Sequence, residues 1–192
     1  PPALKALLSW PDLKIDGFIL PGHVTTIIGT KPYEFLATDY KIPSVVTGFE
    51  GEDILQAIMM LLEQKASGRA EVEIQYTRVV KKEGNQKAMS LINTYFEPCD
   101  ANWRGIGVIP GSGLKLKNAM RRWDVSQVFN LEIPDAPEPK GCQCGLVLRG
   151  VKIPTDCRLF GKACTPEHPV GACMVSTEGS CAAYYKYSGV VR

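Results

Sequence analysis

Six of the seven cysteines of this chain fall within its last 51 residues, where their thiols could bind a metal or form disulfides. They follow the pattern C-x-C-x12-C-x6-C-x8-C-x7-C, at Cys142, Cys144, Cys157, Cys164, Cys173 and Cys181. Cysteine makes up about 12% of this segment, above the roughly 8–10% that marks a small disulfide-rich unit. The segment therefore differs in kind from the rest of the chain.

Three kinds of cysteine chemistry compete for this pattern. Disulfides suit a dense short unit, but nothing in the sequence points to an oxidising compartment. Structural zinc usually shows paired C-x2-C or C-x2–4-C knuckles, and this spacing has none. A cubane iron–sulfur cluster needs four thiolates, and these come from scattered loops in many proteins. The spacing favours a cluster over disulfides and leaves both open.

The C-x-C pair at the start of the pattern is informative. In an extended chain, residues i and i+2 point to the same side, so Cys142 and Cys144 are expected to approach one metal centre together. Prolines and glycines surround the other cysteines and suit tight loops around a compact object. They are Pro154, Gly161, Pro166, Pro169, Gly171 and Gly179.

The cysteines follow a body that reads as alternating strands and helices. Short apolar runs at 16–20 and 43–48 predict buried strands, and 31–40 predicts a short helix. Residues 52–64 predict an amphipathic helix that Gly68 ends. Its apolar stripe is Ile54, Leu55, Ile58, Leu61 and Leu62.

The second half of the body continues the alternation. Residues 70–80 alternate in polarity and predict a half-exposed strand, while 85–97 carry an apolar helical stripe. Residues 104–113 predict a strand entering a tight turn, and 114–125 another short helix. Strands that alternate with helices of about 10–15 residues favour a parallel sheet.

The fold class is therefore α/β, with a parallel-sheet body and a loop-rich, cysteine-dense tail. The body is expected to span residues 1–133, and the tail residues 142–192. Between them, residues 134–141 contain three prolines and predict a linker.

Charge and hydropathy exclude several classes of function. The net charge of +2 gives no electrostatic footprint for nucleic acid or anionic lipid. The longest apolar run, at 57–62, is far shorter than the ~20 residues of a membrane span. No leader peptide opens the chain, so a cytoplasmic protein is expected. The chain begins Pro1-Pro2 without an initiator methionine, which suggests a fragment of a longer protein.

The cysteine segment and four motifs of the body resemble one known family. The segment reads CQCGLVLRGVKIPTDCRLFGKACTPEHPVGACMVSTEGSCAAYYKY. The body motifs are DGFILPGHVTTIIG, VVTGFEGEDILQAI, QYTRVVKKEGNQKA and WRGIGVIPGSGL. All resemble the HypD family of nickel–iron hydrogenase maturation proteins, in the expected order and over essentially the whole chain.

The resemblance implies a cubane [4Fe–4S] cluster in an arrangement similar to ferredoxin–thioredoxin reductase. Carried over residue by residue, it assigns Cys144 and Cys173 as a redox-active pair. The cluster ligands are then Cys142, Cys157, Cys164 and Cys181. The alternative role for any one of these residues is a buried structural thiol.

Polar residues outside the cysteine pattern form a second group of candidates. His23 and Glu50 each follow a predicted strand, where sites form in open α/β sheets. His23 alone would read as a structural imidazole, but the resemblance places it in a cleft where iron is handled, together with Glu178. Without the resemblance, Glu178 reads as a helix-start carboxylate. Glu50 and Arg104 are weaker candidates, and Cys99 reads as an ordinary thiol.

The resemblance also implies a function. The chain would be the cluster-bearing portion of a scaffold on which iron receives two cyanides and one carbon monoxide, forming Fe(CN)2CO before delivery to the hydrogenase large subunit. The implied partners are a HypC-like chaperone and a HypE-like cyanide donor, and the amino-terminal part of HypD is missing here. A stand-alone iron–sulfur thiol–disulfide reductase and a structural metal module remain as alternatives.

Overall fold

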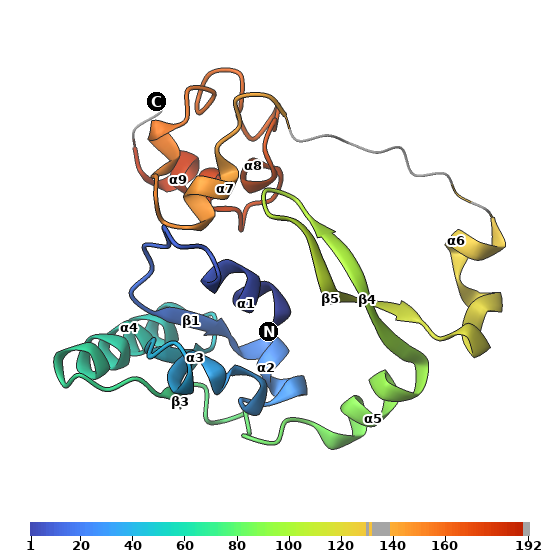
Figure 1. Cartoon of the computed structure of the whole chain (residues 1–192). Helices are drawn as coiled ribbons and strands as arrows, with labels where there is room; N and C mark the ends of the chain where they lie inside the picture. The colour runs from blue at the N-terminus through green and yellow to red at the C-terminus, as the bar shows by residue number, and fades with distance from the viewer. Residues whose placement is uncertain (130, 132–138, 190–192) are drawn as a thin grey trace. The chain divides into compact units, whose positions relative to one another are not determined.

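The computed structural model describes residues 1–129, 131 and 139–189 and has a mixed α/β fold with a cysteine-rich carboxyl-terminal region, as the sequence predicts (Figure 1). Most of the predicted proline-rich linker at 134–141 lies outside the described residues, so the predicted domain boundaries stay predictions. The chain forms two compact units. The first contains Pro1 and Ile15–Glu97, and the second contains Pro2–Lys14 and the chain from Pro98 onward.

A three-stranded parallel sheet organises the first unit. Its order is β1 (Phe18–Pro21), β2 (Ser44–Thr47) and β3 (Val72–Ile74). All four residues of β2 are buried, because β2 lies between the other two strands. Its unbroken apolar and small-residue composition is typical of a parallel strand covered on both faces. Both strands expected from the sequence are confirmed, but only β2 is buried throughout, because β1 at the edge of the sheet buries Leu20 alone and leaves Ile19 46% exposed.

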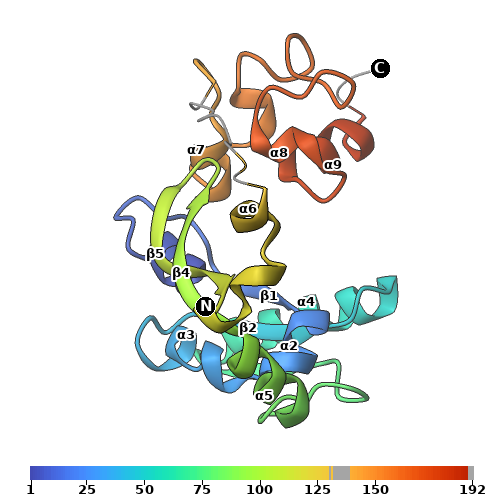
Figure 2. The ribbon, with the colours of Figure 1, turned by 90° about the vertical axis from the view of Figure 1, so that its right-hand side faces the viewer.

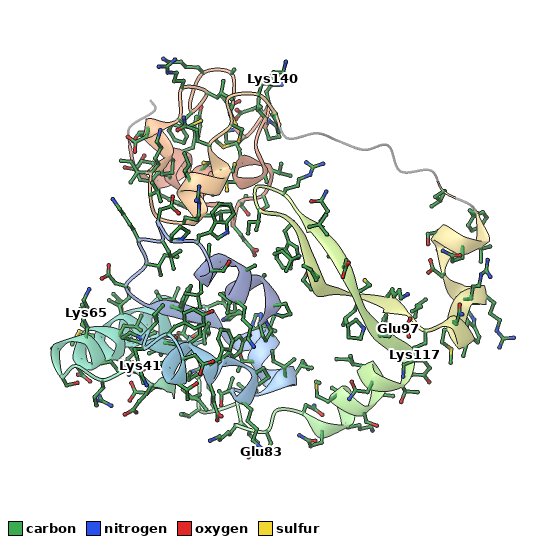
Figure 3. The ribbon with its side chains drawn as sticks, in the orientation of Figure 1. Lys41, Lys65, Glu83, Glu97, Lys117 and Lys140 are labelled. Atoms are coloured by element: carbon green, nitrogen blue, oxygen red, sulfur yellow. The ribbon has the colours of Figure 1, made fainter. Side chains whose placement is uncertain are left out.

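Helices and short helical turns connect these strands. They are α2 (Gly22–Ile28), η1 (Lys31–Tyr33), α3 (Phe35–Thr38), α4 (Gly51–Ala66) and α5 (Gln86–Tyr95). The predicted helices at 31–40, 52–64 and 85–97 are confirmed with shifted ends. Helix α4 ends where Gly68 adopts a left-handed φ of 66°, which glycine does without steric cost. In its last turn Lys65, labelled in Figure 3, pairs with Asp16 ahead of β1.

The buried face of α4 differs from its apolar stripe. Asp53, Ala57 and Gln64 are buried, whereas Leu55 and Leu62 are 65% and 59% exposed. The polar residues face inward because they hydrogen-bond to the chain around β3, and the small Ala57 allows close approach to the sheet. The helix is amphipathic as predicted, but hydrogen bonds decide which face is buried.

A two-stranded sheet follows α5 and corrects two sequence predictions (Figures 1 and 2). Strand β4 (Phe96–Trp103) begins where the sequence predicts the helix to continue to residue 97. Strand β5 (Gly107–Leu116) runs straight through the stretch predicted to turn at 110–113. Gly113 lies against β4, where a Cβ would come within 3.1 Å of the Cys99 sulfur, so close strand packing explains this glycine better than a turn.

The remaining elements of the second unit are short. They are α1 (Pro2–Leu8), η2 (Asn118–Trp123), α6 (Val125–Val128), α7 (Cys144–Leu148), η3 (Pro154–Asp156), α8 (Ala172–Val175) and α9 (Ser180–Tyr187). Helix α1 contacts β5. The helix predicted at 114–125 is shorter, because its first residues belong to β5. In the described part of the chain, every helix falls short of the length and apolar character that crossing a bilayer requires.

Candidate functional site

Thiols form much of the buried core of the carboxyl-terminal region. Cys144, Cys164, Cys173 and Cys181 are each no more than 7% exposed. They pack with Phe160, Met174 and Ala182, and the half-buried Cys142 and Cys157 pack against this cluster. The structure therefore brings together all six cysteines of the sequence pattern. Cys99 lies apart from them in β4, half-buried.

Five of these thiols line one cavity of about 10 Å³, about the volume that a single water molecule needs, and the cavity opens partly to solvent. They are Cys142, Cys144, Cys157, Cys164 and Cys181. The walls between them are mostly apolar and include Leu159, Phe160 and Met174. Short helices and tight loops carry the sulfurs, as the surrounding prolines and glycines predict. The sixth thiol, on Cys173, is not among the residues that line this cavity.

Cys144 is the central member of a chain of three thiols. It opens α7, and its sulfur lies 3.3 Å from the sulfur of Cys142 in the preceding turn. The backbone N–H of Cys173, in α8, donates to the Cys144 sulfur at 3.4 Å. The i, i+2 pair thus lies on one side, as predicted, although α7 begins at its second member.

Gly171 makes room for this arrangement. A Cβ at this position would lie 2.4 Å from the Cys142 sulfur and 2.7 Å from the Cys144 sulfur, closer than non-bonded atoms can approach. Gly171 also precedes α8, the helix that carries Cys173. Sequence reasoning assigned this glycine only a loop role, although its place two residues before a cysteine is a usable signal.

Backbone groups also fix Cys164. The N–H of Val170 donates to its sulfur at 3.3 Å, and its own N–H donates to the carbonyl of Leu159 at 2.9 Å. These two hydrogen bonds hold the Cys164 sulfur in one orientation, and an amide that donates to sulfur is a contact that metal-bound thiolates also make.

The protonation of the thiols differs from one to the next. Burial raises the pKa of Cys142 to about 11 and that of Cys181 to about 12. A hydrogen bond to Cys173, together with burial, raises the pKa of Cys144, and the same hydrogen bond lowers the pKa of Cys173. Without a metal, Cys142 and Cys181 are thus protonated at neutral pH, so metal binding there must release protons.

Arg149 supports the helix that carries Cys144. Its side chain is 15% exposed, and its guanidinium donates to both carboxylate oxygens of Asp12 at 2.7 and 3.0 Å. It also lies 4.2 Å above the ring of Trp10 and donates to the carbonyl of Gly145. One nitrogen, Nη1, makes both contacts to Asp12 while Nε donates to Gly145, and these contacts tie α7 to the amino-terminal segment.

The polar candidates outside the cysteine pattern divide between the two units. In the first, His23 is exposed in the first turn of α2, with its ring 4.4 Å from that of Phe49, and Glu50 stands at the N-cap position of α4 without a capping hydrogen bond from its side chain. In the second, Glu178 is exposed ahead of α9 and Arg104 lies in the turn between β4 and β5. The thiol cavity is lined by neither Glu178 nor Arg104.

Sequence reasoning missed an ion pair near the carboxyl ends of β2 and β3, between the buried Asp53 and the exposed Arg78. Asp53 is 4% exposed and accepts both guanidinium nitrogens of Arg78, at 3.0 and 2.7 Å. The side chain of Gln75 adds a third hydrogen bond at 2.9 Å. These contacts, the Arg78 hydrogen bonds foremost, lower the pKa of Asp53. The sequence did not reveal this pair, because an acidic residue such as Asp53 is common in the first turn of any helix.

The donor set can be tested against the chemistry of a cluster. No group of three or more His, Cys, Asp or Glu side chains in the described residues is close enough to hold a single metal ion. A cubane binds each of its four thiolates at a different iron, so its ligands surround a body instead of meeting at one point. Thiols spread around an apolar cavity supply that donor set, and the cavity would have to widen to hold a cubane.

Comparisons with known proteins give the family. The model of the HypD family, described as hydrogenase formation hypA family, matches residues 1–188. The chain is 46% identical over 194 residues to the hydrogenase maturation factor HypD of Cupriavidus necator, covering 97% of this chain and 51% of that protein. It is 49% identical over 189 residues to a putative hydrogenase expression/formation protein of Methanocaldococcus jannaschii, covering 97% of this chain and 52% of that protein.

The chain therefore spans about half the length of the curated relatives it matches. The match reaches from the sheet of the first unit to the last described helix, so it includes every cysteine of the cavity. Because the family model covers nearly all of its residues, the chain belongs to the HypD family, as its motifs predict.

Proposed function

We propose that the carboxyl-terminal region binds a [4Fe–4S] cluster through Cys142, Cys157, Cys164 and Cys181. The observation that carries this proposal is the set of thiols around one apolar cavity, with the sixth thiol against Cys144. The amide that donates to the Cys164 sulfur supports its role as a ligand, because hydrogen bonds to sulfur tune such clusters.

Cys144 and Cys173 are the redox pair in this proposal. They lie in contact, and the shared hydrogen bond lowers the pKa of Cys173, which makes it the more nucleophilic member at neutral pH. Joining the two sulfurs releases two electrons and two protons, and opening the disulfide takes them back. A bound cluster beside Cys144 would supply or accept these electrons one at a time.

The wider role follows from the relatives, which are named hydrogenase maturation or expression/formation proteins. We propose that the chain serves, in the cytoplasm, as the cluster-bearing part of a scaffold on which iron is assembled into Fe(CN)2CO. A HypC-like chaperone and a HypE-like cyanide donor are its proposed partners, and the hydrogenase large subunit is the destination. His23 and Glu178 are proposed to act at the iron-handling cleft.

Metal analysis of six single cysteine variants tests the assignment. After anaerobic reconstitution, the wild type is expected to carry about four irons and four sulfides per chain. Each of the four ligand variants should lose most of this iron and the paramagnetic resonance signal of the reduced cluster. Cys144→Ala and Cys173→Ala should keep the iron but lose the two-electron thiol titration.

Three results would contradict parts of the proposal. Uptake of zinc in place of iron, or three stable disulfides, would remove the cluster. Reduction of thioredoxin-like substrates at full rate by the isolated chain would favour a stand-alone reductase. Maturation that survives both Cys144→Ala and Cys173→Ala, tested in a full-length relative, would leave the metal a structural role only.

A further inference from the structure

A segment of the second unit exposes an unusual number of large apolar side chains. Of residues 98–131 without residue 130, here called the open segment, Ile109 alone is buried. Eight large apolar side chains of the open segment are between 41% and 69% exposed. They are Trp103, Val108, Leu114, Trp123, Val125, Val128, Phe129 and Leu131.

The elements of the open segment are too small to stand alone in water. The segment consists of the β4–β5 hairpin, which Figures 1 and 2 show as two strands side by side, the six residues of η2 and the four residues of α6. An isolated two-stranded hairpin is marginally stable, and helices this short need tertiary packing. In the described part of the chain, no third strand pairs with either outer edge of the hairpin.

The exposed stripe of α4 differs in this respect. Helix α4 is 16 residues long and already packs on β2 through the fully buried Ala57. It is therefore held in place without further cover, although Leu55 is 65% exposed. The open segment is held at Ile109, by the contact of β5 with α1 and by the hairpin turn at Gly105, which lies against α7, and these contacts leave its large apolar side chains exposed.

The relatives have enough further chain to cover the open segment. They match this chain over 97% of its length, so the open segment is part of their sequence too. Yet each of them has about as many further residues again, because this chain spans 51–52% of their length. A chain of that size can supply the apolar face and the strand that the hairpin lacks.

We propose that the open segment is the docking surface for the polypeptide that forms the other half of the HypD relatives. The exposed apolar residues of η2 and α6 pack against an apolar face of that polypeptide, and a strand of it pairs with a free edge of the hairpin. This assembly does not depend on metal binding. The docking proposal can therefore be contradicted without contradicting the proposed cluster, and the reverse is also true.

Co-expression tests this docking surface. The probe is the part of the Methanocaldococcus jannaschii relative that this chain does not match, produced together with the tagged chain. We expect it to co-purify in a 1:1 complex by light scattering. Leu114→Asp should lower the amount retained at least tenfold. Leu114 is 58% exposed, so this variant should keep the circular dichroism and thiol count of the wild type.

A matched variant on α4 serves as the control. Leu55→Asp places the same charge on the other exposed apolar surface and should retain the probe fully. Equal retention by Leu114→Asp, equal loss with Leu55→Asp, or no complex with the wild type would overturn the proposal. So would a stable dimer of the chain alone that shields the open segment.

Hydrogen exchange gives a second and independent measurement. Amides of the open segment should exchange at least tenfold faster in this chain alone than at the matching positions of the full-length relative. Amides in the first two turns of α4 should exchange at similar rates in both. Equal rates in the open segment would show that it needs no cover, and would refute the proposal.

Discussion

The two best-packed regions of the molecule are built from different materials. In the first unit, the fully buried residues include the aliphatic Leu36, Val45 and Val46, together with polar residues that hydrogen-bond inside the fold, namely Thr25, Ser44 and Gln64. In the carboxyl-terminal region, four of the seven buried core residues are cysteines. Apolar burial stabilises the first region, whereas the second region has a core of thiols, which are groups able to bind a metal.

This difference separates two sources of stability. A core of aliphatic side chains responds to changes in volume and apolar area. A core of thiols responds to what the thiols bind, because a ligand that binds the folded state alone adds its binding energy to folding. A substitution in one region, with the stability of the other region as the reference, can therefore test whether the two regions are stabilised independently.

The largest effect is expected from removing a cavity thiol. Cys164 is 7% exposed and accepts an amide hydrogen bond at its sulfur, so Cys164→Ala should abolish iron retention and unfold the region around it. After both proteins are reconstituted with iron, amides over residues 142–189 should exchange on the order of a hundredfold faster in the variant than in the wild type. This factor corresponds to a loss of about 2.7 kcal/mol in local stability. Exchange in the parallel sheet should not change.

Cys99→Ala is the control for this experiment, because Cys99 is a thiol outside the cavity. It should leave both iron content and exchange over residues 142–189 at wild-type values. Faster exchange in the parallel sheet after Cys164→Ala would mean that the two regions do not have separate sources of stability.

A cavity in the aliphatic core should have the converse effect. Leu36 is fully buried in α3, and Leu36→Ala should lower the free energy of unfolding of the first unit by about 2–5 kcal/mol. All three tryptophans lie in the second unit, so tryptophan fluorescence reports on that unit alone. In Leu36→Ala, the urea midpoint followed by circular dichroism should therefore fall, whereas the midpoint followed by tryptophan fluorescence should keep its wild-type value.

Leu55→Ala is the matched control, because Leu55 is 65% exposed on α4. Its free energy of unfolding should lie within about 0.5 kcal/mol of the wild-type value. A fluorescence transition that moves together with the circular dichroism transition in Leu36→Ala would show that the two units unfold as one.

Gly171→Ala probes the fit of the thiols without removing any of them. The added methyl group would collide with the sulfurs of Cys142 and Cys144, which must then move. We expect a loss of about 1–3 kcal/mol in the stability of the region, together with a lower iron content after reconstitution. Gly51→Ala, where a Cβ would meet open space, should change neither quantity. Full iron content in Gly171→Ala would mean that these two sulfurs need not approach so closely.

The sequence predicts most of the parallel sheet and misses the hairpin, for physical reasons. Strands β1 and β2 are short apolar runs bounded by turn residues, a local signal that burial reinforces. Strand β4 begins at Phe96, directly after a helix whose apolar stripe that residue continues, so local pattern favours helix there. Only pairing with β5, which is not local, makes it a strand.

The same distinction applies to the candidate site. Composition and spacing predict that six cysteines act together, because thiols at this density are typical of disulfide-rich or metal-binding units. Which thiols are neighbours cannot be derived from spacing, since Cys144 and Cys173 are 29 residues apart. The requirement for Gly171, and the Asp53–Arg78 pair that turns a polar face of α4 inward, likewise depend on contacts made after folding.

The smallest effect concerns pH, and it is confined to the first unit. The hydrogen bonds from Arg78 and Gln75 lower the pKa of Asp53 in the folded state below its value in the unfolded chain. The stabilisation from this carboxylate is therefore complete above the unfolded pKa of about 4. It is lost as pH falls through the lowered folded pKa, because the folded state must then bind the proton that the unfolded state already holds.

Asp53→Asn should flatten this acid dependence. The urea midpoint followed by circular dichroism should fall less between pH 6 and pH 3 in the variant than in the wild type, although the variant starts from a lower value. Glu52→Gln, at an exposed neighbour in the same helical turn, should keep the wild-type slope. If Asp53→Asn keeps that slope as well, other carboxylates dominate the acid response, and the Asp53–Arg78 ion pair is not what distinguishes the first unit from the thiol core.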